Sequence, residues 1–480
     1  MATSELYGVN AELIQSIAST PVSTDTTIIF IGACASGDLN KPYIITSFSD
    51  YATKLGGAKG DGYNLTEAAL AAFSIANINK VIMIPVSHST TITAADYIGD
   101  ASALTGVYAI EAMLAKQPTA VNLICAPGVS DSTVLSAIKD ICIKADGHWS
   151  SFMLYDVPTA NGQINAAGVA QVDEIVSAKN LSHEQASAVW GNVKIDGNYV
   201  VSGAAVRACL MAKSDASYGV PARTGGNLQV TSTQELVINS SDEITNTCVG
   251  QGGTRYTLTF TLTQEGYTDY NGVLYCSAVV GTMTGDVSKS DYVTFANGVG
   301  TMDFAAGSSI SQPAITTHKV FIDSVKPIYI PEPIATQLSA DGICSFVNYS
   351  GTFYTWGDHT SAFTNGTVSD ERARFDNSIR MLLMLTNRFQ MKYRTTVDAP
   401  MTLQMRNDVI NEELDNLASL VAIGAIIGEP ACSFEAIDNP TDSVAQGQFT
   451  WRIQATPTIP FKYGNMKVAY SQAGLSVYTA

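Results

Sequence analysis

Two different residue patterns follow one another along this chain, and the change between them limits the folds that it can adopt. From residue 26 to about residue 225, short apolar runs rich in β-branched residues alternate with segments of helical period. Strands are expected at 27–31, 43–46, 81–86, 121–126, 152–157 and 188–195, and helices at 65–76, 103–115, 132–144, 169–178 and 199–213. This alternation predicts an α/β layer with a mainly parallel sheet.

The pattern changes at Gly226. From there to about residue 320 the helical period disappears, and polar and apolar residues alternate in short runs such as 255–262 and 273–279. Period-two alternation between turn residues is typical of an antiparallel sandwich or barrel. With 3 basic and 8 acidic residues between 226 and 322, this segment is acidic. We expect a separate β domain inserted into the α/β unit.

Helical and mixed patterns return after residue 320. One helix is expected to begin near Ser369, and a second is expected over 401–427, where the end of the helix is apolar all round and therefore buried. After residue 457 apolar residues alternate as in a strand. The predicted organisation is α/β, or α+β overall: an N-terminal arm (1–25), a middle α/β domain (26–225, continued by 321–345), an inserted β-sandwich or barrel (226–320), a C-terminal α+β domain (346–456) and a C-terminal strand or arm (457–480).

Charge and composition exclude several classes of function. The net charge is −17, and an acidic field repels phosphate, so no nucleic-acid partner is expected. The chain start lacks the basic and apolar regions of a signal peptide, and the longest uncharged apolar stretch, 417–428, is too short to span a membrane. The eight cysteines form no C-x-x-C pair and are expected to be small buried side chains in a reducing compartment.

Motifs for catalysis do not assemble in the sequence. The turn at 32–38 has two glycines but lacks the lysine of a phosphate-binding loop, and the glycine-rich segment 56–62 is better explained as a surface loop than as an anion site. No two of the five histidines share ligand spacing. The pair Asp358–His359 beside Trp356 is the most site-like cluster, although a structural turn is the favoured interpretation. We therefore assign no catalytic, cofactor-binding or metal-binding residue, expect no cofactor, and do not expect an enzyme.

One stretch has the opposite charge to the rest of the chain. Residues 368–406 contain 7 basic and 4 acidic residues, and the basic ones are interleaved with the apolar stripe of the expected helix. One interpretation is a solvated helix face neutralised by the protein's own carboxylates. The other is a docking surface for an acidic partner or for the acidic face of a second copy.

Several motifs in the last third resemble those of the sheath proteins of contractile phage tails and related contractile injection systems. Residues 351–360 resemble the glycine, Trp-Gly and Thr signature of that family, with His359 where the family usually carries arginine. Residues 424–428 resemble its Gly-Ala-Leu-x-Gly helix end, and Asn439-Pro440 followed by Gly447 and the expected strand 449–455 resembles its closing segment. Residues 218–222 are similar to the joint that precedes the family's variable insertions.

The resemblance implies a structural protein that polymerises as stacked hexameric rings around an inner tail tube and contracts to drive the tube through a target envelope. The implied partners are other copies of the chain, the tube protein, and baseplate and tail terminator proteins. The implied location is a virion tail or a tail-like particle assembled in the cytoplasm of the host or producer cell. Terminal arms of such proteins add strands to sheets of neighbouring subunits.

Two groups of residues are candidates for these contacts. The strand-exchange arm would use the alternating apolar residues near the C-terminus, Met466, Val468, Tyr470, Leu475 and Val477. Contacts with the tube or between subunits would use charged residues of the two C-terminal helices, Arg374, Arg380, Arg388, Lys392, Arg394, Glu412, Glu413 and Asp415.

Two alternatives remain open. An α/β nucleotide-binding enzyme with a β-domain lid would fit the alternation of strands and helices, but it requires a nucleotide or metal site. An adhesive β-rich surface protein would fit the inserted segment, but not the cysteine usage or the missing signal peptide.

Overall fold

The computed structural model describes residues 26–478, apart from 146, 161, 166–168, 196–198, 231–234, 252–255, 262–273, 280–291, 297–298, 305–315 and 350. Within 235–327 it describes only the path of the backbone. The chain divides into two compact units, Met1–Thr402 and Leu403–Ala480.

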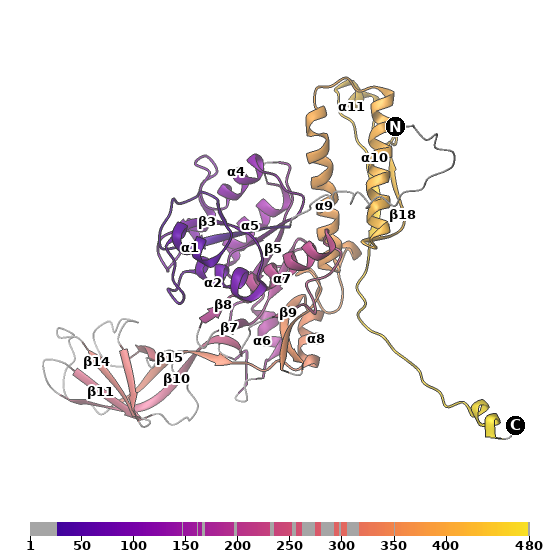
Figure 1. Cartoon of the computed structure of the whole chain (residues 1–480). Helices are drawn as coiled ribbons and strands as arrows, with labels where there is room; N and C mark the ends of the chain where they lie inside the picture. Colours follow the sequence, from indigo (N-terminus) through magenta and orange to yellow (C-terminus); the bar gives the residue numbers. More distant parts are fainter. Residues whose placement is uncertain are drawn as a thin grey trace, which may run out of the picture. The chain divides into compact units, whose positions relative to one another are not determined.

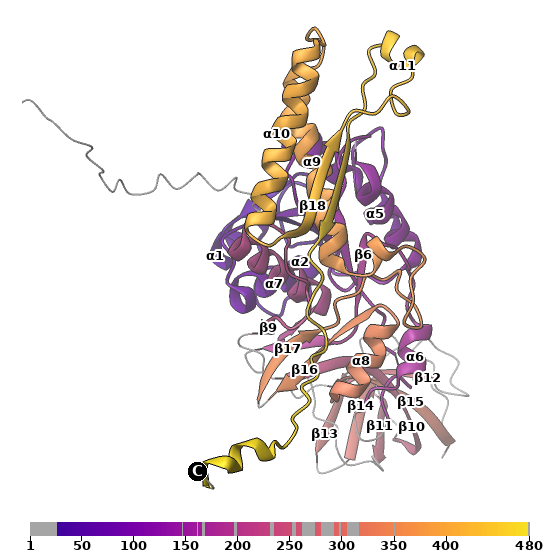
Figure 2. The ribbon, with the colours of Figure 1, turned by 90° about the vertical axis from the view of Figure 1, so that its right-hand side faces the viewer.

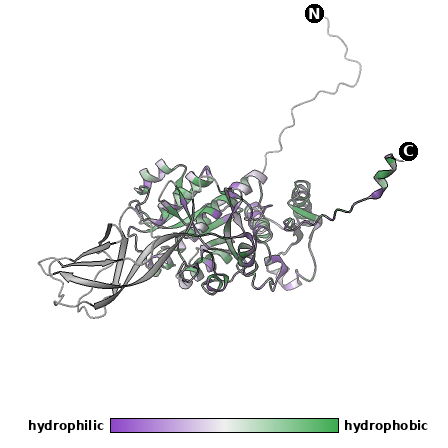
Figure 3. Ribbon diagram, turned by 90° about the horizontal axis from the view of Figure 1, so that it is seen from below, coloured by the Kyte–Doolittle hydropathy of each residue, from purple (hydrophilic) through white to green (hydrophobic). Residues whose placement is uncertain are grey.

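A nine-stranded sheet forms the centre of the first unit (Figure 1). Its middle strands run parallel in the order β3–β1–β4–β5–β6–β16, with β2 antiparallel at one edge and β17 and then β9 antiparallel at the other. The strands are β1 (Thr27–Ala33), β2 (Tyr43–Ile45), β3 (Val81–Ser87), β4 (Asn122–Cys125), β5 (Phe152–Asp156), β6 (Ala186–Val189), β9 (Gln229–Val230), β16 (Ile343–Tyr349) and β17 (Thr352–Trp356). Strands β1, β4, β5 and β6 are buried along their whole length, which explains their continuous apolar runs. Figure 3 shows these central strands as hydrophobic.

Helices cover both faces of this sheet. Helix α2 (Asn64–Leu70) continues into the π-helical turn η1 (Ala71–Ala76), and both pack against α7 (Gly203–Tyr218). Helices α3 (Ala94–Ile98) and α4 (Tyr108–Lys116) pack against α5 (Ser132–Lys144). Because parallel crossovers are right-handed, the two groups lie on opposite faces. Helix α1 (Phe48–Leu55) packs against α2 and β2, while α8 (Glu332–Ala340) packs against β16 and α6 (Val172–Ser177). The expected α/β fold class is confirmed.

The strands described between 235 and 327 close into an antiparallel ring. In the order β10–β11–β14–β13–β12–β15, each strand pairs with the next, and β15 pairs back with β10. The strands are β10 (Glu235–Gln251), β11 (Tyr256–Thr261), β12 (Leu274–Val279), β13 (Tyr292–Ala296), β14 (Val299–Phe304) and β15 (Thr316–Pro327). The start of β10 also pairs with β7 (Asn192–Ile195), which forms a hairpin with β8 (Tyr199–Val201). One continuous strand therefore links this barrel to the α/β region.

The chain after β17 is mainly helical. In the first unit it forms the turn η2 (Glu371–Ala373), the long helix α9 (Asp376–Tyr393) and the turn η3 (Arg394–Thr396). The second unit contains α10 (Leu403–Ala422), β18 (Ile426–Ser433), α11 (Thr441–Ala445), β19 (Arg452–Pro457) and η4 (Gln472–Tyr478), and β18 lies along α10 (Figure 2). Among the described helices, none has the length and apolar character that a membrane span needs.

Two expected helices were wrong at one end. The helix expected to reach residue 427 ends at Ala422, because Gly424 adopts a left-handed conformation (φ 72°) and the β-branched Ile426 and Ile427 begin β18. The end of that segment is also not buried all round, since the side chain of Ile423 is 56% exposed. Residues 199–201 form β8 instead of starting a helix, and α7 begins after Ser202, whose hydroxyl accepts a hydrogen bond from the amide of Ala205.

The strands expected near the C-terminus are also absent from the described chain. Residues 458–471 form no regular secondary structure, and residues 472–478 form the turn η4. A strand needs a neighbour for its backbone hydrogen bonds, so an alternating pattern alone does not fix its conformation.

The six cysteines with described side chains are all free and buried, namely Cys34, Cys125, Cys142, Cys209, Cys344 and Cys432. Burial raises the pKa of Cys34 to about 11, so its thiolate is scarce at neutral pH. We expect these six to remain unmodified when the native protein is treated with iodoacetamide, and to react fully in denaturant. Peptide mass spectrometry measures both states, and rapid native labelling at Cys34 would contradict its burial.

Candidate assembly surfaces

The crevice where a doubly wound sheet would hold a ligand is filled by side chains of the protein. Ligands bind such sheets at the carboxyl ends of the strands where the strand order reverses, which here lies between β1 and β4. The side-chain oxygen of Asn64 accepts a hydrogen bond from the amide of Ala33 (2.7 Å), and its nitrogen donates to the Tyr97 hydroxyl (2.6 Å) and the Pro127 carbonyl (3.1 Å). A Cβ on Gly32 would lie 2.2 Å from that oxygen. The place expected for a nucleotide in the enzyme alternative is therefore occupied.

The glycine-rich loop before α2 is likewise closed by its own residues. The carboxylate of Asp61 accepts hydrogen bonds from the amides of Ala58 (2.8 Å) and Tyr63 (3.0 Å) and from the Thr66 hydroxyl (3.0 Å). Backbone amides that could hold an anion are thus paired with a carboxylate. This geometry favours the surface-loop interpretation.

The Asp358–His359 pair lies in the protein interior. The His359 ring stacks between Phe363 and Phe375, with centroid distances of 3.8 and 5.3 Å, and its Nδ1 lies 3.0 Å from the Arg374 carbonyl oxygen. Both members of the pair are buried, which favours the structural interpretation. Within the described residues, no three His, Cys, Asp or Glu side chains are grouped so as to hold a metal ion.

A carboxyl group near the filled crevice gives a testable pH dependence. Burial, together with the charge of Asp156, raises the pKa of Glu67 from 4.5 to about 8. A raised pKa in the folded state stabilises the fold fully below the unfolded pKa, and this contribution is lost as pH rises through 8. We expect the unfolding free energy of the wild type to fall by about 2–3 kcal/mol more between pH 6 and 9 than that of Glu67→Gln. Urea titrations of the wild type and Glu67→Gln between pH 6 and 9 measure the difference, and the exposed Glu174→Gln serves as control. If the unfolding free energy of all three proteins changed equally with pH, the prediction would be contradicted.

The structure separates the basic residues expected to form one surface. Lys392 and Arg394, at the end of α9 and the start of η3, are exposed, and Arg388 one turn earlier is half-buried. Arg374 lies before the helix, where it pairs with Glu371 (2.6 Å) and stacks over Phe363 (5.3 Å). Of the basic residues expected to form this surface, three remain together at the C-terminal end of α9, and we call them the basic end of α9 (Arg388, Lys392 and Arg394).

Arg380 does not belong to that surface. Its side chain is 1% exposed and is bound by Asp215 of α7, at 2.6 and 2.8 Å, and by the Arg223 carbonyl at 2.6 Å. Because Arg380 lies in the protein interior, a partner cannot reach it, and its assignment to a contact surface needs correction. The helical period places it among apolar neighbours, and a buried charge must then find an opposite charge.

Three further charged residues, which were not among the expected site residues, complete this interior cluster. Arg207 of α7 donates to the Asp376 carboxylate of α9 (2.8 Å), while Arg380 lies 4.0 Å from the same carboxylate. All four side chains, Arg207, Asp215, Asp376 and Arg380, are almost completely buried. We call them the buried charge network. Its sequence signal is an arginine inside the otherwise apolar run 204–212, since such a residue requires buried partners.

The three acidic candidates lie on α10. Glu412 and Asp415, three residues apart and hence on one side of the helix, are exposed, whereas Glu413 is buried. Glu412 and Asp415 are therefore the members of this group that a partner could reach.

The second unit contains a small sheet with open edges. Among the described strands, β18 and β19 pair only with each other, so each has one unpaired edge. The β18 edge is interrupted by a register shift between Ile427 and Ala431, and it carries Glu429 and Pro430, features that block pairing with another strand. The β19 edge has no proline before its last residue, Pro457. It is the edge better suited to accept a further strand.

The chain beyond β19 forms an exposed apolar segment, which we call the C-terminal arm (458–478). Its root is tied to the second unit, because the Thr458 amide donates to the Ala425 carbonyl (3.1 Å). Beyond it, the apolar side chains alternate and are strongly exposed, with Phe461 at 89% and Val468 at 80%. The expected arm residues Met466, Val468, Tyr470, Leu475 and Val477 are all exposed here. So much apolar surface on one segment is typical of a region that binds a partner.

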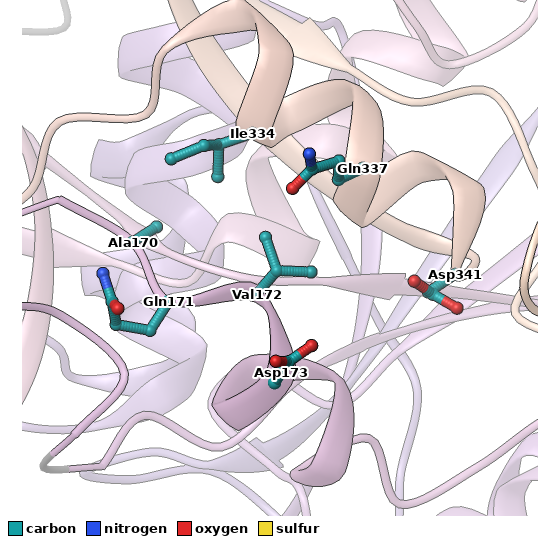
Figure 4. Close-up of a pocket in the computed structure, with 7 residues that line it drawn as sticks. All are labelled: Ala170, Gln171, Val172, Asp173, Ile334, Gln337 and Asp341. Carbon is teal, nitrogen blue, oxygen red and sulfur yellow. The ribbon is translucent and has the colours of Figure 1, made fainter.

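A shallow depression lies between α6 and α8. It has a volume of about 480 Å³ and is lined by Ala170, Gln171, Val172, Asp173, Ile334, Gln337 and Asp341 (Figure 4). The Asp341 carboxylate also accepts a hydrogen bond from the Asn365 amide (3.0 Å). Its open shape and mixed polar lining differ from the enclosed, mainly apolar pockets that bind small molecules.

Comparisons with known proteins identify the class of this fold. No protein-family model matches the chain. Over 128 residues the chain is 31% identical to the major tail sheath protein of Serratia phage KSP20, an alignment that spans 27% of this chain and 30% of that protein. Less than a third of the length of that relative is therefore matched.

Two solved structures share the fold over nearly the whole chain. A sheath complex of the extracellular contractile injection system PVC in its contracted state is matched with a TM-score of 0.58 at 12% identity, over 99% of this chain and 100% of that one. A chain of the anti-feeding prophage baseplate is matched with a TM-score of 0.57 at 12% identity, over 98% and 100%. The expected resemblance to contractile tail and injection-system sheath proteins is thus confirmed in sequence and in fold.

Proposed function

We propose that this chain is a structural sheath subunit of a contractile phage tail or tail-like particle, without catalytic activity. Copies of it assemble as stacked hexameric rings around an inner tube, and contraction of the assembly drives the tube through a target envelope. Baseplate and tail terminator proteins bind at its ends, and assembly takes place in the cytoplasm of the host or producer cell. The division into arms (1–25 and 457–480), middle domain, insertion (226–320) and C-terminal domain (346–456) is part of this proposal.

The observation that carries the proposal is an open strand edge and an exposed, strand-patterned arm in the same chain. A two-stranded sheet is only marginally stable alone, and adding a third strand satisfies its edge with main-chain hydrogen bonds. In the isolated chain, the alternating apolar residues of the C-terminal arm are exposed to water. Binding of the arm to a partner removes this apolar surface from water, which is favourable. Exchange of arms between copies gives the open strand edge its hydrogen-bond partners and buries the apolar residues of the arm.

The composition of the arm selects the part that pairs. Pro460 interrupts the first apolar run, whereas residues 466–470 contain no proline and alternate Met466, Val468 and Tyr470 with Lys467 and Ala469. Residues 466–470 are therefore the added strand, and the β19 edge of a neighbouring copy is its acceptor. Gly464 and Asn465 separate this strand from the root of the arm and allow the chain to change direction.

The exposed charges take a supporting role in this proposal. The basic end of α9 and the exposed pair Glu412 and Asp415 have opposite signs and lie outside the buried charge network. Complementary charges at an interface favour the correct alignment of subunits and speed their association. These residues contact the tube or adjacent subunits.

Negative-stain electron microscopy tests the proposal. The full-length chain, with and without its tube protein, is compared with chains lacking residues 1–25 or 458–480; the second deletion leaves β19 intact. Long hollow tubes from the full-length chain and their loss in the truncated chains would support arm-linked assembly. Absence of polymers in every condition, together with tight binding of a nucleotide, would contradict the proposal and favour the enzyme alternative.

A further inference from the structure

The buried charge network contacts three places in the first unit from which a further segment of the chain continues, and we call these places roots. Thr26, the first described residue after the N-terminal segment, donates its hydroxyl hydrogen to Asp215 (2.9 Å). The loop 222–226 leads towards the barrel, and there the Gly225 amide donates to the Asp376 carboxylate (3.0 and 3.2 Å) and the Gly225 carbonyl accepts from Arg207 (2.9 Å). Asp376 itself begins α9, the helix that leads in sequence to the second unit.

The network also binds these three roots to each other. Arg380 of α9 holds both Asp215, which carries Thr26, and the Arg223 carbonyl of the loop. Arg207 of α7 holds Asp376 and, in addition, the Gly357 carbonyl that follows β17 (2.9 Å). A displacement of any one root therefore has to move a charged side chain that also holds another root.

Stability alone does not explain such a network. A buried ion pair recovers little more than the cost of removing its charges from water, and apolar side chains of similar size often serve as well. In the part of the chain that the structure describes, the Nε atoms of Arg207 and Arg380 have no hydrogen-bond partner, so even the hydrogen bonds are incomplete. What charged pairs supply and apolar contacts lack is directional geometry, which fixes the roots in one arrangement.

We propose that the buried charge network is a coupling joint: it links the root of the N-terminal segment, the root of the barrel and the start of α9, so that a displacement at one root is transmitted to the other two. The four charges cancel, with two arginines facing two aspartates, and the joint therefore carries no net charge. Arg207, Asp215, Asp376 and Arg380 act as positioning residues. The coupling is a property of the single chain, so it can hold or fail independently of the proposed sheath role.

Hydrogen exchange in the full-length chain tests the joint at roots that the altered residue does not touch. Arg207→Gln changes contacts at Gly225, Gly357 and Asp376, and coupling predicts about tenfold or more faster exchange in peptides covering 26–31 as well. Thr26→Val removes one hydroxyl at the opposite end and is expected to leave the fold intact. For this milder variant, coupling predicts about threefold or more faster exchange in 222–228 and 376–384.

A buried side chain on the same helix provides the control. Asn387 of α9 holds the Ser150 and Ala120 carbonyls (2.8 and 3.1 Å) and lies outside the network. Asn387→Ala is expected to speed exchange near residue 150 and to leave 26–31 and 222–228 unchanged. If Arg207→Gln does not fold, Thr26→Val and Asp215→Asn decide the outcome. Changes confined to the root next to each substitution would show separate local bonds and overturn the proposal.

Discussion

Replacing Val468 with aspartate is expected to prevent polymerisation of an otherwise folded chain. In the proposed strand, Met466, Val468 and Tyr470 share one face, which is buried against the neighbouring copy. Loss of a buried valine costs about 1.5–3 kcal/mol per contact, and burying an unpaired carboxylate costs more. Since 1.4 kcal/mol corresponds to a factor of ten, the concentration needed for assembly should rise about a hundredfold or more. Sedimentation of polymers over a concentration series measures this change.

The adjacent position supplies a matched control. Ala469→Asp introduces the same charge in the same arm, but on the opposite face of a strand, because successive side chains alternate. It is expected to change the assembly concentration by less than about tenfold. Equal effects of the two variants would show that the arm does not bind as a strand. Circular dichroism and melting temperature should be unchanged in both, since residues 458–471 lie outside regular secondary structure.

Arg380→Met is expected to destabilise the first unit strongly. The substitution keeps the length and apolar stem of the side chain but leaves Asp215 buried without its cation. Breaking a buried pair in this way typically costs about 3–5 kcal/mol, a large part of the total stability of most domains. Urea unfolding followed by tryptophan fluorescence measures the loss, because Trp149 and Trp190 are buried in this unit.

A double variant separates the loss of the Arg380–Asp215 attraction from the cost of leaving Asp215 buried without a cation. Arg380→Met combined with Asp215→Leu removes both charges, so it should be more stable than Arg380→Met alone by at least about 1 kcal/mol. Lys392→Met, an exposed cation on the same helix, should change stability by less than about 0.5 kcal/mol. A double variant less stable than both single variants would mean that the charge pair itself, and not the uncompensated charge, determines the cost.

The parallel core was predictable because its signal is local. Strands β1 and β3–β5 and helix α5 match the expected ranges closely, since buried strands give continuous apolar runs and α5 has an aspartate cap at Asp131 before a clear helical period. The break at Gly191 was less visible: residues 188–195 were expected to form one strand, but Gly191 has φ 96° and separates β6 from β7, which belong to different sheets. Only the three-dimensional turn distinguishes two short apolar strands from one long one.

The buried charge network could not be found from charge counts. Arg380 lies in a basic stretch whose other members are exposed or paired near the surface, and its partner Asp215 is 165 residues away in sequence. The sequence shows that a charge falls among apolar residues; it does not show which opposite charge meets it. Pairing at that separation is a consequence of the fold, in which α7 and the start of α9 lie together.

The C-terminal arm is the reverse case, because its pattern is visible in the sequence but the expected strand is not present in the described chain. Its alternation is plain in the sequence, yet the described chain forms no strand there, because a strand requires a partner that a single chain does not supply. Under the proposed function, this pattern describes the assembled subunit rather than the isolated one. The same holds for the β19 edge, which lacks blocking features and is the acceptor in the proposed assembly.

Cryo-electron microscopy of the assembled polymer, at a resolution that separates strands, determines whether the C-terminal arm of one copy pairs with the β19 edge of another. We expect a third strand along β19, formed by residues 466–470 of another copy, with Val468 buried and Lys467 exposed. A polymer in which the β19 edge faces solvent, or in which the C-terminal arm folds back on its own chain, would contradict it.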